Sequence, residues 1–225
     1  MSTRVLEIAK SEMERLDPNS VRYFDWKKRR QIYKLLNVDS TSTPNPRHMF
    51  LAIQSAEFVL PLFQPVDPDD AVVFELLEGA KAFLDDRADN LDKLNKVEDE
   101  GYYLSEGFGY NFETGQRDYQ SFYAGFAAYK ALVEVRHMID PWEHIDLLSK
   151  SQNVMRSGIP EIVGWTSGHD FTDEDWNHLA AFGDTAAAAS FAYSTSRTLD
   201  QCQPKLLYEF WKWWTEVALP KALAY

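Results

Sequence analysis

The sequence has only one cysteine, Cys202, so the chain cannot form an internal disulfide. It also lacks any apolar run of the ~18 residues that a membrane-spanning helix needs. The first residues, from Met1 to Glu7, contain no apolar signal core, which argues against secretion. These absences exclude a disulfide-stabilised scaffold and a helical membrane protein, and they predict a protein of the reducing cytoplasm.

Common catalytic motifs are missing as well. The chain has no Gly-x-Ser-x-Gly elbow, and Gly107-Phe108-Gly109-Tyr110 lacks the third glycine and the preceding strand of a phosphate-binding loop. Cys202 precedes Pro204 at a predicted helix start, where a thiol can be activated, but no histidine lies close to it in the sequence. We therefore interpret Cys202 as a structural residue.

Positive charge is scarce. The chain has 23 Lys and Arg against 35 Asp and Glu, which gives a net charge of −12. Residues 1–50 carry ten basic against six acidic side chains, a net +4, and the other 175 residues carry 13 against 29, a net −16. Phosphate backbones require clustered Lys and Arg, so we predict no nucleic-acid partner. The four side chains of the basic run from Lys27 to Arg30 point to all sides of a predicted helix. Such a run is typical of residues that are solvated or paired with acids of the same chain.

The residues that are present favour a helical core. The composition is 45% hydrophobic and 14% aromatic, enough to fill a large interior. Apolar residues recur with helical spacing, whereas proline and glycine interrupt residues 140–170. The sequence predicts an all-α fold, with residues 1–225 forming a single domain. We expect a bundle of seven to eight helices with a long irregular excursion before the last two.

Start and stop signals place the individual helices. Asn45-Pro46 and Asp67-Pro68 are cap-and-proline starts, and Thr172 with Asp175 forms a variant of the capping box. The small residues between Gly183 and Ala189 predict close packing against the bulky last helix. The expected helices cover residues 5–16, 20–36, 46–60, 68–84, part of 85–100, 114–137, 172–194 and 204–218, and a weak strand signal lies at 162–165.

A metal centre was considered from two patterns. Glu134 and His137 form a single Glu-x-x-His motif, whereas a di-iron bundle needs two such motifs and two further glutamates, for which Glu57 and Glu78 are the helical candidates. We therefore predict no metal and no cofactor.

The second pattern suggests an alternative function, a metal-dependent helical hydrolase. His169 and Asp170 form a His-Asp dyad, with His137 and His144 upstream and Asp184 downstream. Metal phosphohydrolases with this order of residues normally carry the dyad within a helix. Here the dyad lies in a predicted loop between Gly168 and Thr172, which disfavours the hydrolase.

Acidic residues concentrate near two predicted helix starts. Helix capping accounts for several of them, and the functional interpretation is an acidic surface that docks on a basic protein and masks a cationic site. The predicted partner-binding residues are Asp67, Asp69, Asp70, Asp85, Asp86, Asp89, Asp170, Asp173, Glu174 and Asp175.

Four stretches resemble an all-helical family of immunity proteins from bacterial polymorphic-toxin systems, the fifth numbered immunity family. They span roughly residues 28–85 and 180–222, and most of their positions are core residues. The stretches are Arg29-Arg30-Gln31-Ile32-Tyr33, Arg47 through Pro61 followed by the Asp-Pro helix start, Asp184-Thr-Ala-Ala-Ala-Ala, and Phe210-Trp211 through Pro220.

The resemblance implies a non-enzymatic protein that binds a cognate toxin and blocks its active site, with no catalytic residues of its own. A toxin with a basic active site, such as a nuclease, would fit the acidic chain. The resemblance also suggests Asp184 as a buried polar anchor and Glu57 as a partner for an arginine of the basic run. A helical scaffold or adaptor without a toxin partner is the remaining alternative.

Overall fold

The computed structural model describes residues 2–37, 46–65, 71–85, 91–105, 107–137, 184–199 and 201–225. Within these ranges the only strands are the two-residue β1 (Tyr110–Asn111) and β2 (Gln116–Arg117), which pair antiparallel. The all-α prediction is confirmed, and the described residues form eight helices when the continuous run at the C-terminal end is counted once. None of the described helices is long and apolar enough to cross a membrane.

The helices follow the chain in a simple order. They are α1 (Ser2–Arg15), α2 (Trp26–Asn37), α3 (Pro46–Val59) with the 3₁₀ turn η1 (Leu60–Leu62), α4 (Val72–Leu84), α5 (Leu91–Ser105), α6 (Tyr119–His137), α11 (Thr185–Ser194), α12 (Pro204–Trp213), the π-helical turn η2 (Trp214–Ala218) and α13 (Leu219–Ala224). In η2 the N–H of Leu219 donates to the carbonyl of Trp214, five residues back. This wide turn directly precedes Pro220, which has no N–H to donate to the preceding turn.

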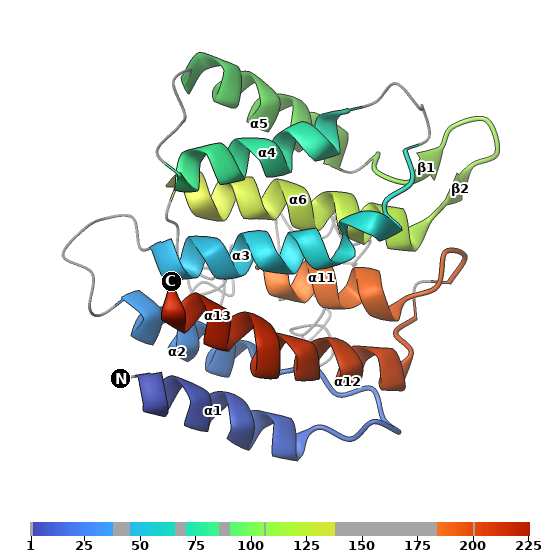
Figure 1. Cartoon of the computed structure of the whole chain (residues 1–225). Coiled ribbons are helices and arrows are strands. Elements are labelled where there is room, and N and C mark those ends of the chain that lie inside the picture. Colours follow the sequence, from blue (N-terminus) through green and yellow to red (C-terminus); the bar gives the residue numbers. More distant parts are fainter. Residues whose placement is uncertain are drawn as a thin grey trace, which may run out of the picture.

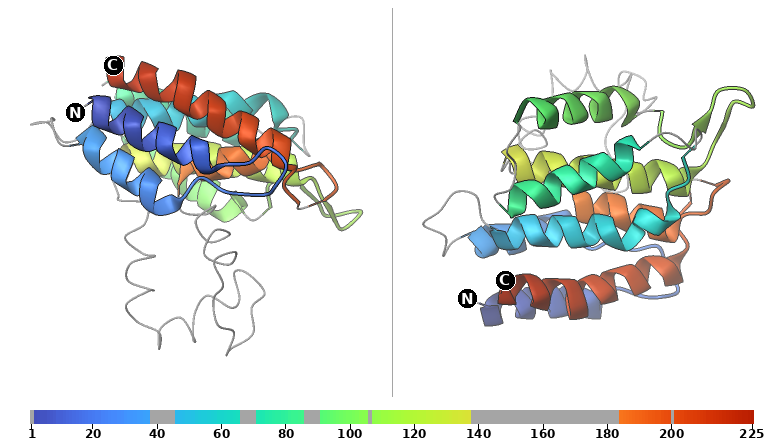
Figure 2. Two further views of the ribbon diagram at one scale, coloured as in Figure 1. Left: turned by 90° about the horizontal axis from the view of Figure 1, so that it is seen from below. Right: turned by 45° about the horizontal axis from the view of Figure 1, so that its top comes forward.

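The helices lie side by side in a row that runs from α5 at one edge to α1 at the other (Figure 1). Two further views show the same arrangement from below and from above (Figure 2). Helix α6 packs against α3, α4, α5 and α11, and α3 also contacts α2 and α13. The predicted packing of the last helix against the small-residue helix is confirmed, since α12 contacts α11.

Small side chains fill one part of the core and large aromatic side chains fill another. On α6 and α11 the alanines are fully buried, as Ala127, Ala131 and Ala188 show, which allows the two helices to approach closely. Aromatic rings pack where the segment before α2 meets α12 and η2; there the ring centroid of Phe24 lies 5.1 Å from Trp211 and 5.5 Å from Trp214. Such edge and tilted contacts add to the stabilisation that burial alone provides.

Two helices begin later than the sequence predicted. Helix α2 begins at Trp26 rather than near Ser20, because the Asp25 carboxylate accepts the N–H groups of Lys27 (2.7 Å) and Lys28 (3.2 Å) and so caps the helix. Helix α4 begins at Val72, whereas the predicted start at Asp67-Pro68 lies outside the described residues. The exposed helix expected within residues 85–100 is present as α5.

The helix predicted over residues 114–137 was wrong at its start, because a β-hairpin precedes it. Gly109 has φ 67°, and a Cβ there would lie 2.3 Å from the carbonyl oxygen of Asp118. The N–H of Asp118 in turn donates to the Gly109 carbonyl at 2.7 Å, and this hydrogen bond closes the hairpin. Asp118 then caps α6 by accepting the N–H of Ser121 at 3.0 Å.

The helix predicted over residues 172–194 is not continuous in its described part. Asp184 is in an extended conformation (φ −141°, ψ 159°) and caps α11, which begins at Thr185. An extended residue cannot lie within a helix, so the helix that carries the run of alanines begins after Asp184. The predicted irregular segment 140–170, the weak strand at 162–165 and the capping box at Thr172 lie outside the described residues.

Candidate functional site

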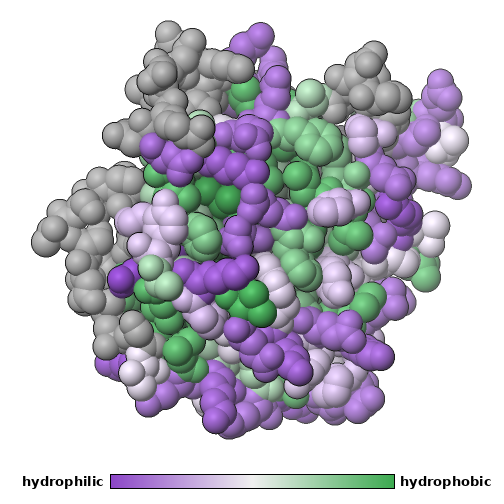
Figure 3. Space-filling view, viewed as in Figure 1, coloured by the Kyte–Doolittle hydropathy of each residue, from purple (hydrophilic) through white to green (hydrophobic). Residues whose placement is uncertain are grey.

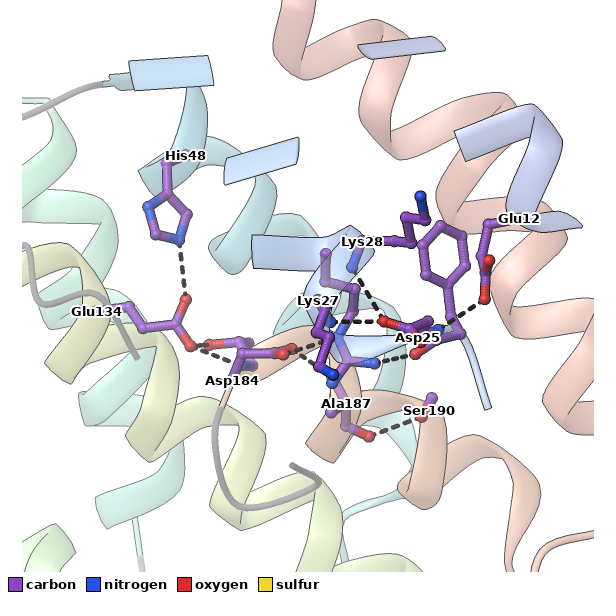
Figure 4. A network of polar contacts seen from close by, with 12 residues as sticks. Glu12, Asp25, Lys27, Lys28, His48, Glu134, Asp184, Ala187 and Ser190 are labelled. Carbon is purple, nitrogen blue, oxygen red and sulfur yellow. Dashed lines mark hydrogen bonds and ion pairs between the residues drawn. The ribbon is translucent and has the colours of Figure 1, made fainter. Parts of the chain in front are cut away.

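Polar side chains from four helices meet in the middle of the apolar core (Figure 4). They come from α2, α3, α6 and the beginning of α11, and all of them are buried. We call this set the core network; its members are Arg29, His48, Glu134, Asp184 and Thr185.

Arg29 and Asp184 form a buried ion pair within the core network. The Nε atom of Arg29 lies 2.8 Å from Oδ2 of Asp184, and the guanidinium also donates to the carbonyl of Phe24. The other oxygen of Asp184 accepts the N–H of Ala187 at 2.7 Å, which caps α11. Asp184 is therefore a buried polar anchor, as the resemblance suggested, because one carboxylate serves both an arginine and a helix start.

Glu134 is the hub of the other half of the network. Its Oε1 atom accepts from the N–H (2.6 Å) and the hydroxyl (2.8 Å) of Thr185, the first residue of α11. Its Oε2 atom lies 3.2 Å from Nε2 of His48, whose ring stacks on Tyr33 with centroids 4.4 Å apart. Glu134 thus joins α6 to α3 and α11, a role that the sequence analysis missed because it considered this residue only as a metal ligand.

Charges within the core are arranged to offset one another. Burial raises the pKa of the Asp184 carboxyl, and Arg29 opposes this shift. Burial lowers the pKa of the Lys130 amino group, and the carboxylates of Glu134 and Asp184 oppose that shift. The network residues are buried and hydrogen-bonded to one another. Their arrangement fixes the positions of α2, α3, α6 and α11 and does not expose polar groups to a substrate.

The prediction that Glu57 pairs with an arginine of the basic run was wrong. Glu57 lies on α3, and its Oε1 atom is 2.8 Å from Nζ of Lys81 on α4. Lys81 also reaches Glu78, one turn earlier on its own helix, at 2.9 Å. The arginine of the basic run that turns inward, Arg29, pairs with Asp184 instead.

A family model for the immunity protein Imm5 matches residues 9–221. The chain belongs to the Imm5 family of immunity proteins. A comparison with curated proteins finds no match. Membership of this family supports a general role in immunity to a toxin and implies a protein that is not an enzyme.

The stretches that resemble the family meet at the core network. The first carries Arg29, the second His48, and the third Asp184 and Thr185. The fourth carries Trp211, whose ring lies 5.3 Å from the Arg29 guanidinium. Segments far apart in the sequence thus contribute to one structural centre of this family member.

Nothing in the described part of the chain supports the metal-dependent hydrolase. There, no group of three or more His, Cys, Asp or Glu side chains is placed to hold a metal ion. Glu134 points into the core network, and His137 is the last residue of α6. His144, His169 and Asp170 lie outside the described residues.

Cys202 is half-buried, and its sulfur lies 3.9 Å from the hydroxyl of Tyr23.

Of the ten residues predicted to form the acidic surface, the structure describes one, Asp85. Asp85 is exposed and follows α4 directly. The predicted residues that lie outside the described ranges are Asp67, Asp69, Asp70, Asp86, Asp89, Asp170, Asp173, Glu174 and Asp175.

The fold separates acidic from basic segments of the chain. Residues 67–105 carry twelve acidic and four basic side chains, a net −8, whereas residues 1–37 carry five acidic and nine basic, a net +4. Helices α4 and α5 lie at one edge of the row and α1 at the other (Figure 1). Helix α1 has as many acidic as basic residues, and the basic run lies on its neighbour α2. We call the exposed acids of the first edge the acidic pole; they are Glu75, Glu78, Asp85, Asp99 and Glu100. On the face shown in Figure 3, hydrophobic residues are interspersed among hydrophilic ones.

Tyr129 on α6 provides a titration that reports on this edge. Burial, then the charge of Glu98, the neighbouring Tyr102 and the charge of Asp99 raise the pKa of Tyr129 from 10.0 to about 12. The folded protein holds this proton more tightly than the unfolded chain. The resulting stabilisation is therefore complete below pH 10 and is lost as pH rises through about 12.

We expect the variant Tyr129→Phe to lack one phenolate absorbance step near pH 12. Its stability should also fall less steeply than that of the parent protein above pH 10. Ultraviolet titration of the two proteins measures the difference. Loss of a step near pH 10 instead would contradict this placement of Tyr129 beside the acids of α5.

Proposed function

We propose that this Imm5 family member neutralises a cognate toxin in the cytoplasm by binding a basic surface of that toxin through its acidic pole. The family match carries the immunity role, and the separation of charge along the row of helices supports the choice of surface. The proposed surface consists of the acidic pole, which includes Asp85, together with the other acids predicted from the sequence, namely Asp67, Asp69, Asp70, Asp86, Asp89, Asp170, Asp173, Glu174 and Asp175.

Charge complementarity explains how such a protein can act without catalysis. A negative surface speeds encounter with a basic partner and disfavours partners of the wrong charge. Enzymes that act on nucleic acids carry clustered Lys and Arg for phosphate binding. An acidic protein that occupies such a surface excludes the substrate by both charge and volume, and a toxin of this class is the partner that fits the proposal.

Charge reversal tests the surface. We expect the double variant Glu75→Lys with Asp99→Lys to bind the toxin at least about 10-fold more weakly, with a flatter dependence on salt. Both residues are exposed, so the substitutions should leave the fold intact. The probe is the toxin that co-purifies from the native cell with a tagged copy of this chain, prepared in a catalytically inactive form, and calorimetry at several salt concentrations measures its binding.

The control places the same change at the opposite edge. Glu7 and Glu14 are exposed on α1, and the variant Glu7→Lys with Glu14→Lys also changes the net charge from −12 to −8. We expect this control to bind nearly as well as the parent protein. Equal losses in both variants would show that only net charge matters, and unchanged binding in the acidic-pole variant would show that the surface is wrong.

A further inference from the structure

The hairpin after α5 buries one phenylalanine and exposes another. Phe108 is buried against α6, where it lies over Gly125, and a Cβ on that glycine would come within 2.9 Å of the ring. Phe112, four residues later, is 81% exposed, more than any other large hydrophobic side chain described. The same hairpin is therefore fixed to the helices at its base and presents an aromatic ring to solvent near its tip.

The turn that carries Phe112 is held by its own hydrogen bonds. The side-chain oxygen of Asn111 accepts the N–H groups of Glu113 (2.9 Å) and Thr114 (3.0 Å), and the N–H of Gly115 donates to the Asn111 carbonyl at 2.8 Å. Gly115 has φ 68°, a conformation that favours glycine. The ring of Phe112 packs edge-on against that of Tyr110, with the ring centroids 4.9 Å apart. These contacts order an exposed side chain, which lowers the entropy it would lose on binding a partner.

A second loop supports the base of the hairpin. Arg197, between α11 and α12, forms an ion pair with Asp118, and its carbonyl accepts the N–H of Tyr119 at 3.1 Å. Leu199 in the same loop is 59% exposed. Both loops project beyond the same ends of the helices, at the right of the row in Figure 1 and of both views in Figure 2. This end thus presents exposed apolar side chains on two loops that are tied to each other.

The hairpin also continues the acidic pole. It follows α5 directly, and the N–H of Gly107 donates to the carbonyl of Leu104 at 2.8 Å. The exposed side chains Tyr102 (63%) and Leu104 (44%) lie on the last turn of α5, beyond Asp99 and Glu100. Acidic residues thus lead into an apolar end, the combination of polar rim and apolar centre that is typical of protein interfaces.

We infer that Phe112 is the main apolar anchor of the toxin-binding surface, and that the exposed side chains of Tyr102, Leu104 and Leu199 add further apolar contacts. Its partner is the cognate toxin, which would present an apolar pocket bordered by Lys and Arg. The charge of the neighbouring segment, −8 over residues 67–105, selects a basic protein over an anionic membrane or an acidic second copy of the chain. This inference rests on the proposed function, because it names an apolar contact that would strengthen toxin binding beside the acidic pole.

The test replaces the anchor in the full-length chain. We expect Phe112→Ala to weaken binding of the inactivated toxin by about 30-fold or more, chiefly through faster dissociation, as truncation of an interface anchor does. Because the side chain is so exposed, the melting temperature should not change. The matched control is Leu6→Ala on α1, which is 37% exposed at the opposite edge and should bind like the parent protein.

The outcomes separate this inference from the proposed function. If Phe112→Ala binds like the parent while Glu75→Lys with Asp99→Lys binds weakly, the anchor is wrong and the acidic pole stands. If Phe112→Ala binds weakly while the charge reversal has no effect, the anchor stands and the acidic pole is wrong. Self-association of the chain alone that Phe112→Ala abolishes, with toxin binding unchanged, would assign the hairpin to a second copy and overturn the inference.

Discussion

Replacing Arg29 with alanine is expected to lower the free energy of unfolding by about 3–5 kcal/mol, because it leaves the Asp184 carboxylate buried without its cation. Asp184 is fully buried, so its carboxylate would lose its cationic partner at a place that bulk solvent does not reach in the folded protein. A loss of this size is a large part of the 5–15 kcal/mol that typically stabilises a protein of this kind. Urea unfolding followed by circular dichroism measures it.

Two comparisons make the Arg29 prediction specific. Lys28→Ala changes an exposed neighbour on the same helix and should alter stability by less than about 0.5 kcal/mol. The pair Arg29→Met with Asp184→Asn removes both charges while asparagine can still cap α11, so it should be more stable than Arg29→Ala alone. An Arg29→Ala protein as stable as Lys28→Ala would show that the ion pair does not hold the fold together.

Replacing Glu134 with alanine should cost about 3 kcal/mol or more, for a different reason. It leaves the N–H and the hydroxyl of Thr185 buried without an acceptor, and each such group costs about 1–3 kcal/mol. Glu134→Gln keeps an acceptor oxygen in the same place and should lose much less. The difference between the two variants measures the hydrogen bonds rather than the packing of the side chain.

Hydrogen exchange locates this effect within the structure. The amide of Thr185 is the first of α11, and Glu134 is its acceptor across 51 positions of the chain. We expect its exchange to accelerate strongly in Glu134→Ala, while amides in the middle of α3 respond only to the overall loss of stability. A uniform change at all amides would contradict a local role for Glu134 at the start of α11.

The sequence was sufficient to predict most helices because each carries a periodic apolar face and a terminating residue. The stop before Asp17-Pro18 and the start at Pro46 are local signals, and both are confirmed by α1 and α3. The hairpin was missed because Gly115 was placed inside the helix predicted over 114–137 and Gly109 was considered only as part of a phosphate-binding loop, whereas both have positive φ. The late start of α2 depended on which of several candidate residues caps it.

The core network could not be predicted as a whole because its members come from distant parts of the chain. Arg29 and Asp184 are 155 positions apart, and His48 and Glu134 are 86 apart. Asp184 was suggested as a buried polar anchor, but an arginine of the basic run was expected to pair with Glu57, whereas Arg29 pairs with Asp184. Which of several buried charges pair depends on helix packing, and periodicity in one sequence does not specify that packing.

The exposed anchor has a similarly weak sequence signal. Phe112 lies between polar residues in a glycine-bounded stretch, and only the fold shows that Phe108 turns inward while Phe112 turns outward. The acidic surface, in contrast, was predicted from composition. The fold adds that α4 and α5 lie at one edge of the row of helices, whereas α1 lies at the other with α2 packed against it.

The most direct test of the proposed function is a titration of the active toxin with this protein. The toxin is the one that co-purifies with a tagged copy of this chain, and its activity is measured as increasing amounts of the full-length chain are added. Stoichiometric neutralisation predicts that activity falls linearly and ends near one equivalent. Full toxin activity in the presence of a large molar excess of the folded chain would contradict the account.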